Sequence, residues 1–319
     1  MLTLPDFKEK KVVFITPKDG LDKTIRFSNF NICFYEYDKL VAKLNVHSIL
    51  AVMIVGDCTL TTYLINKLTE HGISIYFLNY SLKNQNHINS VAEGNYQLRE
   101  KQYFLPPQSQ LEISKNIVKN KITNQYDVLK KAKKEDLSEV MEKSFARIDK
   151  VENLQQLLAH EGYFSSKYFP LLFEDVDWHR RAPQTKEDPI NTVLDVGYTI
   201  LFNYIDSLLN LFGFDCYKGI YHQEFYKRKS LVCDLMEPIR PIIDYNIIKA
   251  INLKQFSLEN DFDFSKGQFG FENYGIRKKY VGVFSEALVK EKSEIYNYLL
   301  SFYRWMLNPE KYPYKFIYF

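Results

Sequence analysis

Residues 191–212 read NTVLDVGYTILFNYIDSLLNLF, a segment of helical length with apolar side chains on nearly every side. A helix that is hydrophobic all round is buried among other elements, whereas a surface helix keeps one polar face. The segment therefore predicts a buried central helix in the second half of this 319-residue chain. Helical spacing also recurs at 113–129, 234–252 and 287–306, which predicts a large helical region around it.

The first 80 residues follow a different pattern, typical of β-strands. β-Branched and aromatic residues are concentrated in five segments: 11–15, 25–37, 40–46, 49–55 and 73–78. One helix is predicted at 59–71, because its apolar residues fall on one face and Gly72 is a typical helix C-cap. This part of the chain is therefore expected to be a small β-rich domain.

Residues 81–95 are polar and turn-forming, which predicts a linker. The sequence as a whole predicts an α+β fold with a β-rich amino-terminal domain at 1–80 and a larger all-α catalytic domain at 96–319. The aromatic tail at 308–319 is expected to cover an edge of the core.

Composition sets wider bounds on the chain. Hydrophobic residues make up 46% of it and aromatic residues 16%, enough for a folded core, while a net charge of +3 gives no whole-protein argument for nucleic acid. The cysteines lie too far apart to suggest a zinc site and are expected to be reduced: Cys33, Cys58, Cys216 and Cys233. No leader and no membrane-spanning run is visible, so a soluble, cytoplasmic protein is expected.

Carboxylates and one histidine flank the central helix. Glu161 stands in a mostly apolar stretch, where a buried carboxylate needs a cation, either a metal ion or an Arg or Lys. His160 competes with it, but adjacent helical residues point in different directions, and Glu161 is preferred. Asp234 and Glu237 are spaced to share one helical face near a common ion, although Asp-x-x-Glu is also a helix-capping pattern. His222, after a glycine-containing turn, is either a ligand or a hydrogen-bonded core residue.

Basic residues accompany these groups. Such a set suggests a divalent ion held over a phosphodiester, and the candidates for phosphate contacts are Arg180, Arg181, Lys227, Arg228 and Lys229. A lysine-rich helix at 113–134 is either a solvated face or a DNA-binding face. Motifs for nucleotide hydrolysis, dinucleotide binding and serine hydrolysis are missing from the sequence.

The order and spacing of several short elements resemble the CRISPR spacer-acquisition integrases, the Cas-one family. The elements are Lys121-Ile-Thr-Asn-Gln125, His160-Glu161-Gly162, Arg180-x-x-Pro183, Asp188-Pro-x-Asn191, Gly197-Tyr198 and the block from His222 to Asp244. The resemblance implies catalytic residues Glu161, His222, Asp234 and Glu237. It implies that Glu161, His222 and Glu237 bind Mn²⁺ or Mg²⁺, with Asp234 behind them.

The resemblance also implies a function and partners. The protein would join the 3′-hydroxyl ends of a captured short DNA (the protospacer) to a CRISPR repeat by transesterification, as a homodimer working with a Cas-two dimer. The β-rich domain would serve dimerisation and DNA contact. Two alternatives stay open: a metal-dependent endonuclease on branched or single-stranded DNA, with water as nucleophile, and a non-catalytic DNA-binding scaffold whose acidic residues form caps and salt bridges.

Overall fold

The computed structural model describes residues 10–15, 23–55, 59–78, 84–88, 95–133, 135–222, 225–265 and 267–319. Its chain contacts divide into two compact units, Met1–Glu100 with Asp206–Asp215, and Lys101–Ile205 with Cys216–Phe319. The α+β fold class is confirmed, with the strands of the first unit followed by a mostly helical region. The functional roles assigned to the two domains stay predictions.

The first unit contains two small sheets. One has the strand order β1-β5-β6-β7, formed by β1 (Lys11–Ile15), β5 (Ile49–Val55), β6 (Ser74–Leu78) and β7 (Asn84–Ile88). The other is an antiparallel sheet of β2 (Lys23–Ser28), β3 (Asn31–Glu36) and β4 (Lys39–Asn45), followed by a 3₁₀ turn, η1 (Val46–Ser48). β1, β5 and β6 are parallel, and the helix α2 (Thr62–Glu70) connects β5 to β6, as parallel strands require.

Local sequence explains most of these elements. β5 is apolar on both faces, and Ile49, Val52 and Ile54 belong to the core that α2 also lines through Leu64 and Leu68. The Thr61 side chain caps α2 by accepting a hydrogen bond from the Leu64 N–H at 3.2 Å. Gly72 follows the helix with a φ of +75°, the left-handed conformation that favours glycine.

Two details of this unit differ from the sequence prediction. The single strand expected at 25–37 is a hairpin, because Asn29 and Phe30 both take positive φ angles and reverse the chain between β2 and β3. β7 lies inside the stretch 81–95 that was predicted as a linker. It pairs antiparallel with β6, and the backbone hydrogen bonds of an edge strand need no apolar pattern.

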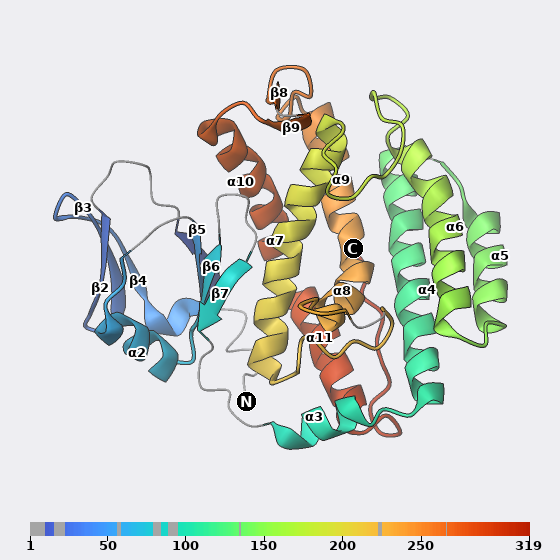
Figure 1. Ribbon diagram of the computed structural model, residues 1–319, viewed down its shortest axis with the longest axis horizontal. Helices are drawn as coiled ribbons and strands as arrows, with labels where there is room; N and C mark the ends of the chain where they lie inside the picture. The colour runs from blue at the N-terminus through green and yellow to red at the C-terminus, as the bar shows by residue number, and fades with distance from the viewer. Residues whose placement is uncertain are drawn as a thin grey trace. The chain divides into compact units, whose positions relative to one another are not determined.

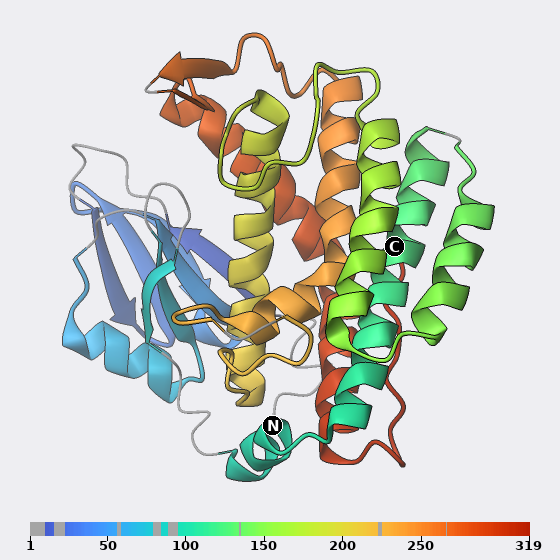
Figure 2. The same ribbon diagram turned by 45° about the vertical axis from the view of Figure 1, so that its right-hand side comes forward.

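The second unit is a helical assembly. Its elements are α4 (Pro107–Ala132), α5 (Ser138–Asp149), α6 (Leu154–Leu172), α7 (Pro189–Phe212), α8 (Ser230–Met236), η2 (Glu237–Ile239), α9 (Arg240–Asn252), α10 (Tyr274–Lys290) and α11 (Lys292–Leu307), except that α7 from Asp206 on belongs to the first unit. α3 (Tyr96–Tyr103) precedes them, and the short hairpin of β8 (Phe262–Ser265) and β9 (Gln268–Phe271) corrects the all-α prediction to mostly helical. α4 packs against α5, α6 and α9 (Figures 1 and 2).

The predicted central helix is α7, most of whose apolar residues are buried. The helix predicted at 234–252 begins earlier and is interrupted: α8 begins at Ser230, a 3₁₀ turn that contains Pro238 follows it, and Pro241 lies in the first turn of α9. The helix predicted at 287–306 is likewise two helices, since α10 ends at Lys290 and α11 begins at Lys292.

The aromatic tail covers the core as predicted. Ile317 is buried, its N–H donates to the Asn120 side chain at 2.9 Å, and its carbonyl accepts from the Asn120 amide at 2.7 Å. Cys33 and Cys216 are buried and Cys233 is partly buried, whereas Cys58 lies outside the described residues. Within the described ranges, no helix is long and apolar enough to cross a bilayer.

Candidate active site in the helical unit

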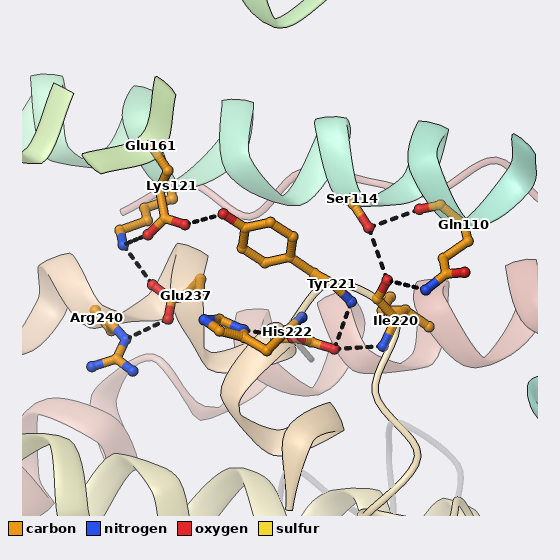
Figure 3. A network of polar contacts seen from close by, with 10 residues as sticks. Gln110, Ser114, Lys121, Glu161, Ile220, Tyr221, His222, Glu237 and Arg240 are labelled. Carbon is orange, nitrogen blue, oxygen red and sulfur yellow. Dashed lines mark hydrogen bonds and ion pairs between the residues drawn. The ribbon is translucent and has the colours of Figure 1, made fainter. Parts of the chain in front are cut away.

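The four residues predicted to be catalytic lie in the second unit, and Figure 3 labels three of them, Glu161, His222 and Glu237. α6 supplies Glu161, the loop before α8 supplies His222, α8 supplies Asp234, and η2 supplies Glu237. A fifth residue, Lys121 of α4, connects two of them. Segments separated by more than a hundred residues therefore meet at one buried polar cluster.

Asp234 holds the loop that carries His222. Its Oδ2 accepts hydrogen bonds from the N–H groups of Ile220 at 2.7 Å and Tyr221 at 3.0 Å, and its Oδ1 accepts from the His222 N–H at 2.9 Å. The same Oδ1 lies 2.7 Å from Nδ1 of the His222 ring. With Nδ1 engaged in this way, Nε2 is the ring nitrogen available to a ligand, an arrangement typical of metal-binding histidines.

The loop passes close to α8. A Cβ on Gly219 would lie 2.6 Å from the Ser230 Cβ and 3.1 Å from Asp234 Oδ2, so a side chain at this position would push the loop away. The Gly-containing turn noted in the sequence thus has a structural role. It lets the backbone approach Asp234 closely enough for three N–H groups to reach the carboxylate.

Glu161 and Glu237 share one cation. The Lys121 Nζ donates to Oε1 of Glu161, and to Oε2 of Glu237 at 2.6 Å. The Tyr221 hydroxyl donates to the other oxygen of Glu161. These side chains are almost fully buried, with exposed fractions of 9% for Lys121, 11% for Glu161 and 3% for Glu237. Without the ammonium, the two carboxylates would lose the cation that they share in a low-dielectric environment.

Arg240 completes the cluster from the first turn of α9. Its Nε lies 3.0 Å from Oε1 of Glu237, an ion pair by distance without the alignment of a hydrogen bond. Its guanidinium covers the ring of Tyr198 at 4.6 Å, and the Tyr198 hydroxyl donates to the buried Asp244 at 2.5 Å. Asp244 also accepts from the Tyr168 hydroxyl at 3.0 Å, so this carboxylate orients both tyrosines.

The charges of the cluster reinforce one another. Burial by itself would raise the pKa of Glu237, but the positive charges of Arg240 and Lys121 outweigh burial and lower this pKa to about 2. Burial would lower the pKa of Lys121, whereas Glu161 and Glu237 raise it above its ordinary value. Glu237 is therefore an anion, and Lys121 a cation, throughout the physiological range.

The donor set fits a divalent ion in its chemistry. Two carboxylates and an imidazole are ligands that Mn²⁺ and Mg²⁺ accept, and the carboxylates already hold a cation between them. As the side chains stand in the described part of the chain, no three His, Cys, Asp or Glu residues are arranged to hold a metal ion. Lys121, Tyr221 and Arg240 instead contact the carboxylate oxygens of Glu161 and Glu237.

The structure answers two questions that the sequence left open: which of His160 and Glu161 is buried, and whether Asp234 and Glu237 cap a helix. Glu161 rather than His160 points into the protein, since Glu161 is buried and His160 only partly so. The Asp-x-x-Glu spacing is not a helix cap here, because Asp234 lies within α8 and binds the 220–222 backbone instead. Glu237 begins the 3₁₀ turn that follows.

The residues predicted to contact DNA have different surroundings. Arg181 has partners within the chain: it donates to Asn191 at 2.8 Å and Asp195 at 2.7 Å and covers the ring of Tyr198, and its phosphate contact stays a prediction. Arg180 is exposed and pairs with Glu187 at 3.2 Å. Lys227 and Arg228 are also exposed, and Lys229 is half-buried before α8.

Several lysines of the basic helix form ion pairs with carboxylates of the chain. Lys115 pairs with Glu112 at 3.3 Å, Lys119 with Asp149, and Lys133 with Asp175, while Lys134 lies outside the described residues. No separate role was predicted for Lys121 from the sequence. A signal was present, because Lys121 stands four residues after Ile117 and thus on the apolar face of α4.

Comparisons with known proteins agree on one family. The family model described as CRISPR associated protein Cas1 matches residues 19–286. A CRISPR-associated endonuclease Cas1 from Thermodesulfovibrio yellowstonii is 32% identical over 253 residues, which cover 74% of this chain and 80% of that protein.

Solved structures share the fold at low identity. A CAS1 protein from Thermotoga maritima superposes with a TM-score of 0.80 at 18% identity and covers 96% of this chain and 100% of that one. A casposase bound to integration product gives 0.77 at 19% identity, covering 96% and 94%. A chain of a Cas6-RT-Cas1–Cas2 complex gives 0.75 at 23% identity, covering 97% of this chain and 36% of that one. With its family model matched over most of its length, the chain belongs to the Cas1 family of CRISPR-associated proteins.

Proposed function

We propose that the helical unit carries the active site of a divalent-metal-dependent DNA integrase, which joins the 3′-hydroxyl ends of a captured short DNA to a CRISPR repeat. The observation that carries this proposal is the meeting of Glu161 and Glu237 at one buried cation, in the same cluster as His222. Membership of the Cas1 family and the fold shared with a casposase bound to integration product support it.

Glu161, Glu237 and the Nε2 of His222 would hold the ion, Mn²⁺ or Mg²⁺. When bound, the ion would lower the pKa of the attacking 3′ hydroxyl and neutralise charge on the phosphate. The other side chains position these ligands. Asp234 fixes the imidazole through Nδ1, Tyr221 holds Glu161, and Arg240 holds Glu237.

The reaction needs no covalent protein intermediate. The 3′ oxygen of the captured DNA attacks a repeat phosphate, one phosphodiester bond forms as another breaks, and the displaced 3′ oxygen takes the proton. Side chains of the protein then have to hold the repeat phosphate in line with the attacking and the leaving 3′ oxygens. Arg180, Lys227, Arg228 and Lys229 are our candidates for that contact, because they are basic and at least partly exposed.

The partners follow from the same proposal. We infer a homodimer that binds protospacer and repeat DNA together with a Cas2 dimer, and the chain's fold matches part of a complex named for Cas1 and Cas2. The β-rich unit would serve dimerisation and DNA contact.

Two other functions use the same residues. An endonuclease would place water where the 3′ hydroxyl attacks, and the matched relative from Thermodesulfovibrio yellowstonii is named an endonuclease. A non-catalytic scaffold would keep Glu161 and Glu237 purely as partners of Lys121, and the observation in favour of this alternative is that their oxygens already have side-chain partners.

The test is a joining assay with a labelled 3′-hydroxyl oligonucleotide, a plasmid carrying the repeat, Mn²⁺, and the Cas2 of the same array. We expect joining by the wild type and by Asp177→Asn, an exposed control, but none by Glu161→Gln or His222→Ala. Joining that persists in both site variants would remove Glu161 and His222 as the proposed metal ligands. If the protein cleaves the plasmid when the supplied oligonucleotide has a blocked 3′ end, the endonuclease is favoured.

A further inference from the structure

Every carboxylate oxygen of Glu161 and Glu237 faces a donor from a side chain. Tyr221 contacts one oxygen of Glu161 and Arg240 one oxygen of Glu237. Lys121 contacts the remaining oxygen of each, and it is the residue common to both carboxylates. Its ammonium therefore lies where an ion bridging the two carboxylates would have to lie.

The charges of Glu161 and Glu237 are already balanced by their two cationic partners. Glu161 and Glu237 contribute two negative charges, and Lys121 and Arg240 contribute two positive charges. A divalent ion on the same oxygens would lie next to the ammonium, and like charges repel strongly where water is excluded. Either the Lys121 ammonium or the Arg240 guanidinium therefore has to move away when the ion binds.

The two cations differ in their freedom to move. The Arg240 guanidinium is a planar group that covers the Tyr198 ring at 4.6 Å, and Tyr198 is itself fixed by Asp244. Lys121 carries a compact charge on a flexible four-carbon stem, and its ammonium donates to the two carboxylates. Lys121 is thus the cation that can leave without disturbing a packed ring.

We propose that Lys121 is a built-in competitor of the catalytic divalent ion, so that ammonium and ion alternate between Glu161 and Glu237. The inference rests on the proposed function, because it takes Glu161, His222 and Glu237 as the ligands of the ion. It gives Lys121 a positioning role: it keeps the two carboxylates together and sets the ion concentration at which the site fills.

Thermal unfolding of the full chain without DNA tests this inference. We compare the wild type with Lys121→Gln in EDTA and across a series of Mn²⁺ concentrations. In EDTA the variant should melt at a lower temperature, because two buried carboxylates lose their shared cation. With Mn²⁺ its melting temperature should rise more than that of the wild type, and its apparent Kd for Mn²⁺ should be about tenfold lower, a typical effect of neighbours on a metal site.

Two control variants separate competition from a loss of structure. Lys121→Arg keeps the positive charge, so it should bind Mn²⁺ no more tightly than the wild type. Lys115→Gln alters a buried lysine on the same helix that pairs with Glu112 and the Asp149 carbonyl, away from the cluster, and should leave Mn²⁺ affinity unchanged.

The outcomes distinguish this inference from the proposed function. If Glu161→Gln abolishes the response to Mn²⁺ but Lys121→Gln binds the ion no more tightly than the wild type, competition by Lys121 is refuted and the metal site stands. If Glu161→Gln and His222→Ala respond to Mn²⁺ as the wild type does, the ion binds elsewhere and the proposed function fails first.

A measurement on the unaltered protein covers the case in which Lys121→Gln does not fold. Acetylation of lysines by a soluble ester is followed at each position by mass spectrometry, with and without Mn²⁺. Lys121 should react slowly in EDTA and faster with the ion, while Lys115 should react equally in both. Equal reactivity of Lys121 under the two conditions would overturn the inference.

Discussion

Asp234→Asn should weaken both the fold of the site and its affinity for a metal ion. The buried carboxylate of Asp234 accepts from three backbone N–H groups and lies 2.7 Å from the Nδ1 of His222, two contacts on each oxygen. An asparagine keeps one oxygen and replaces the other with an NH₂ group. Whichever way the amide is turned, two of the four contacts therefore face a donor instead of an acceptor.

The size of the effect follows from this geometry. A hydrogen bond to a charged group contributes about 1.5–3 kcal/mol, so losing two lowers the free energy of unfolding by about 3–6 kcal/mol. His222 can relieve one conflict if Nδ1 loses its proton and accepts from the amide. The proton then sits on Nε2, the nitrogen proposed to bind the ion, and Mn²⁺ affinity should fall by about 10–100-fold.

Urea unfolding followed by tryptophan fluorescence measures the first effect, because Trp178 and Trp305, the two tryptophans of the chain, lie in the helical unit. Calorimetric titration with Mn²⁺ measures the second. Asp177→Asn, whose side chain is 98% exposed, serves as control and should change neither quantity. An Asp234→Asn protein as stable as that control would refute the assignment of Asp234 as the residue that holds the loop.

Three further predictions concern other parts of the helical unit. Burial raises the pKa of Asp244 from its ordinary 3.8 to about 6, so the folded state favours its proton and loses stability as pH rises through that window. Relative to Asp244→Asn, the unfolding free energy of the wild type should therefore fall by ~3 kcal/mol between pH 4 and 7; parallel pH profiles would contradict this. Gly197→Ala should destabilise the protein by about 1–3 kcal/mol in urea unfolding, because its Cβ would lie 2.3 Å from the Ile243 Cγ2, whereas Gly162→Ala, with open space around it, should not. Replacing both Lys227 and Arg228 with Ala should lower the slope of log DNA affinity against log salt by about 2, and an unchanged slope would exclude them from the phosphate contacts.

The sequence predicted best the features that depend on one segment at a time. The apolar pattern of α7 and the burial of Glu161 follow from the amino acids around them. Pairing between segments was harder to predict. β7 is a polar edge strand whose partner supplies its hydrogen bonds, and the turn at Asn29 and Phe30 has no glycine to indicate positive φ.

The site shows the same limit. Lys121 lies 40 residues from Glu161 and 116 from Glu237 in the chain, so nothing in the spacing of the sequence predicts that the three pair. Composition even favoured another interpretation, since seven lysines near one another suggested a solvated or DNA-binding helix face. Packing of α4 against α6 and η2 places one of these lysines at the carboxylates.

Asp234 and Glu237 stand three residues apart, yet their surroundings suit them to different tasks. The oxygens of Asp234 are taken by backbone N–H groups and by His222, and backbone donors cannot move away without unfolding the loop. The oxygens of Glu237 face Lys121 and Arg240, side-chain cations that another cation can replace. A metal ion needs oxygens that can be released to it, so Glu237 suits the role of ligand and Asp234 that of the residue behind His222. We propose these roles from the type of donor around each carboxylate rather than from its place in the Asp-x-x-Glu pattern.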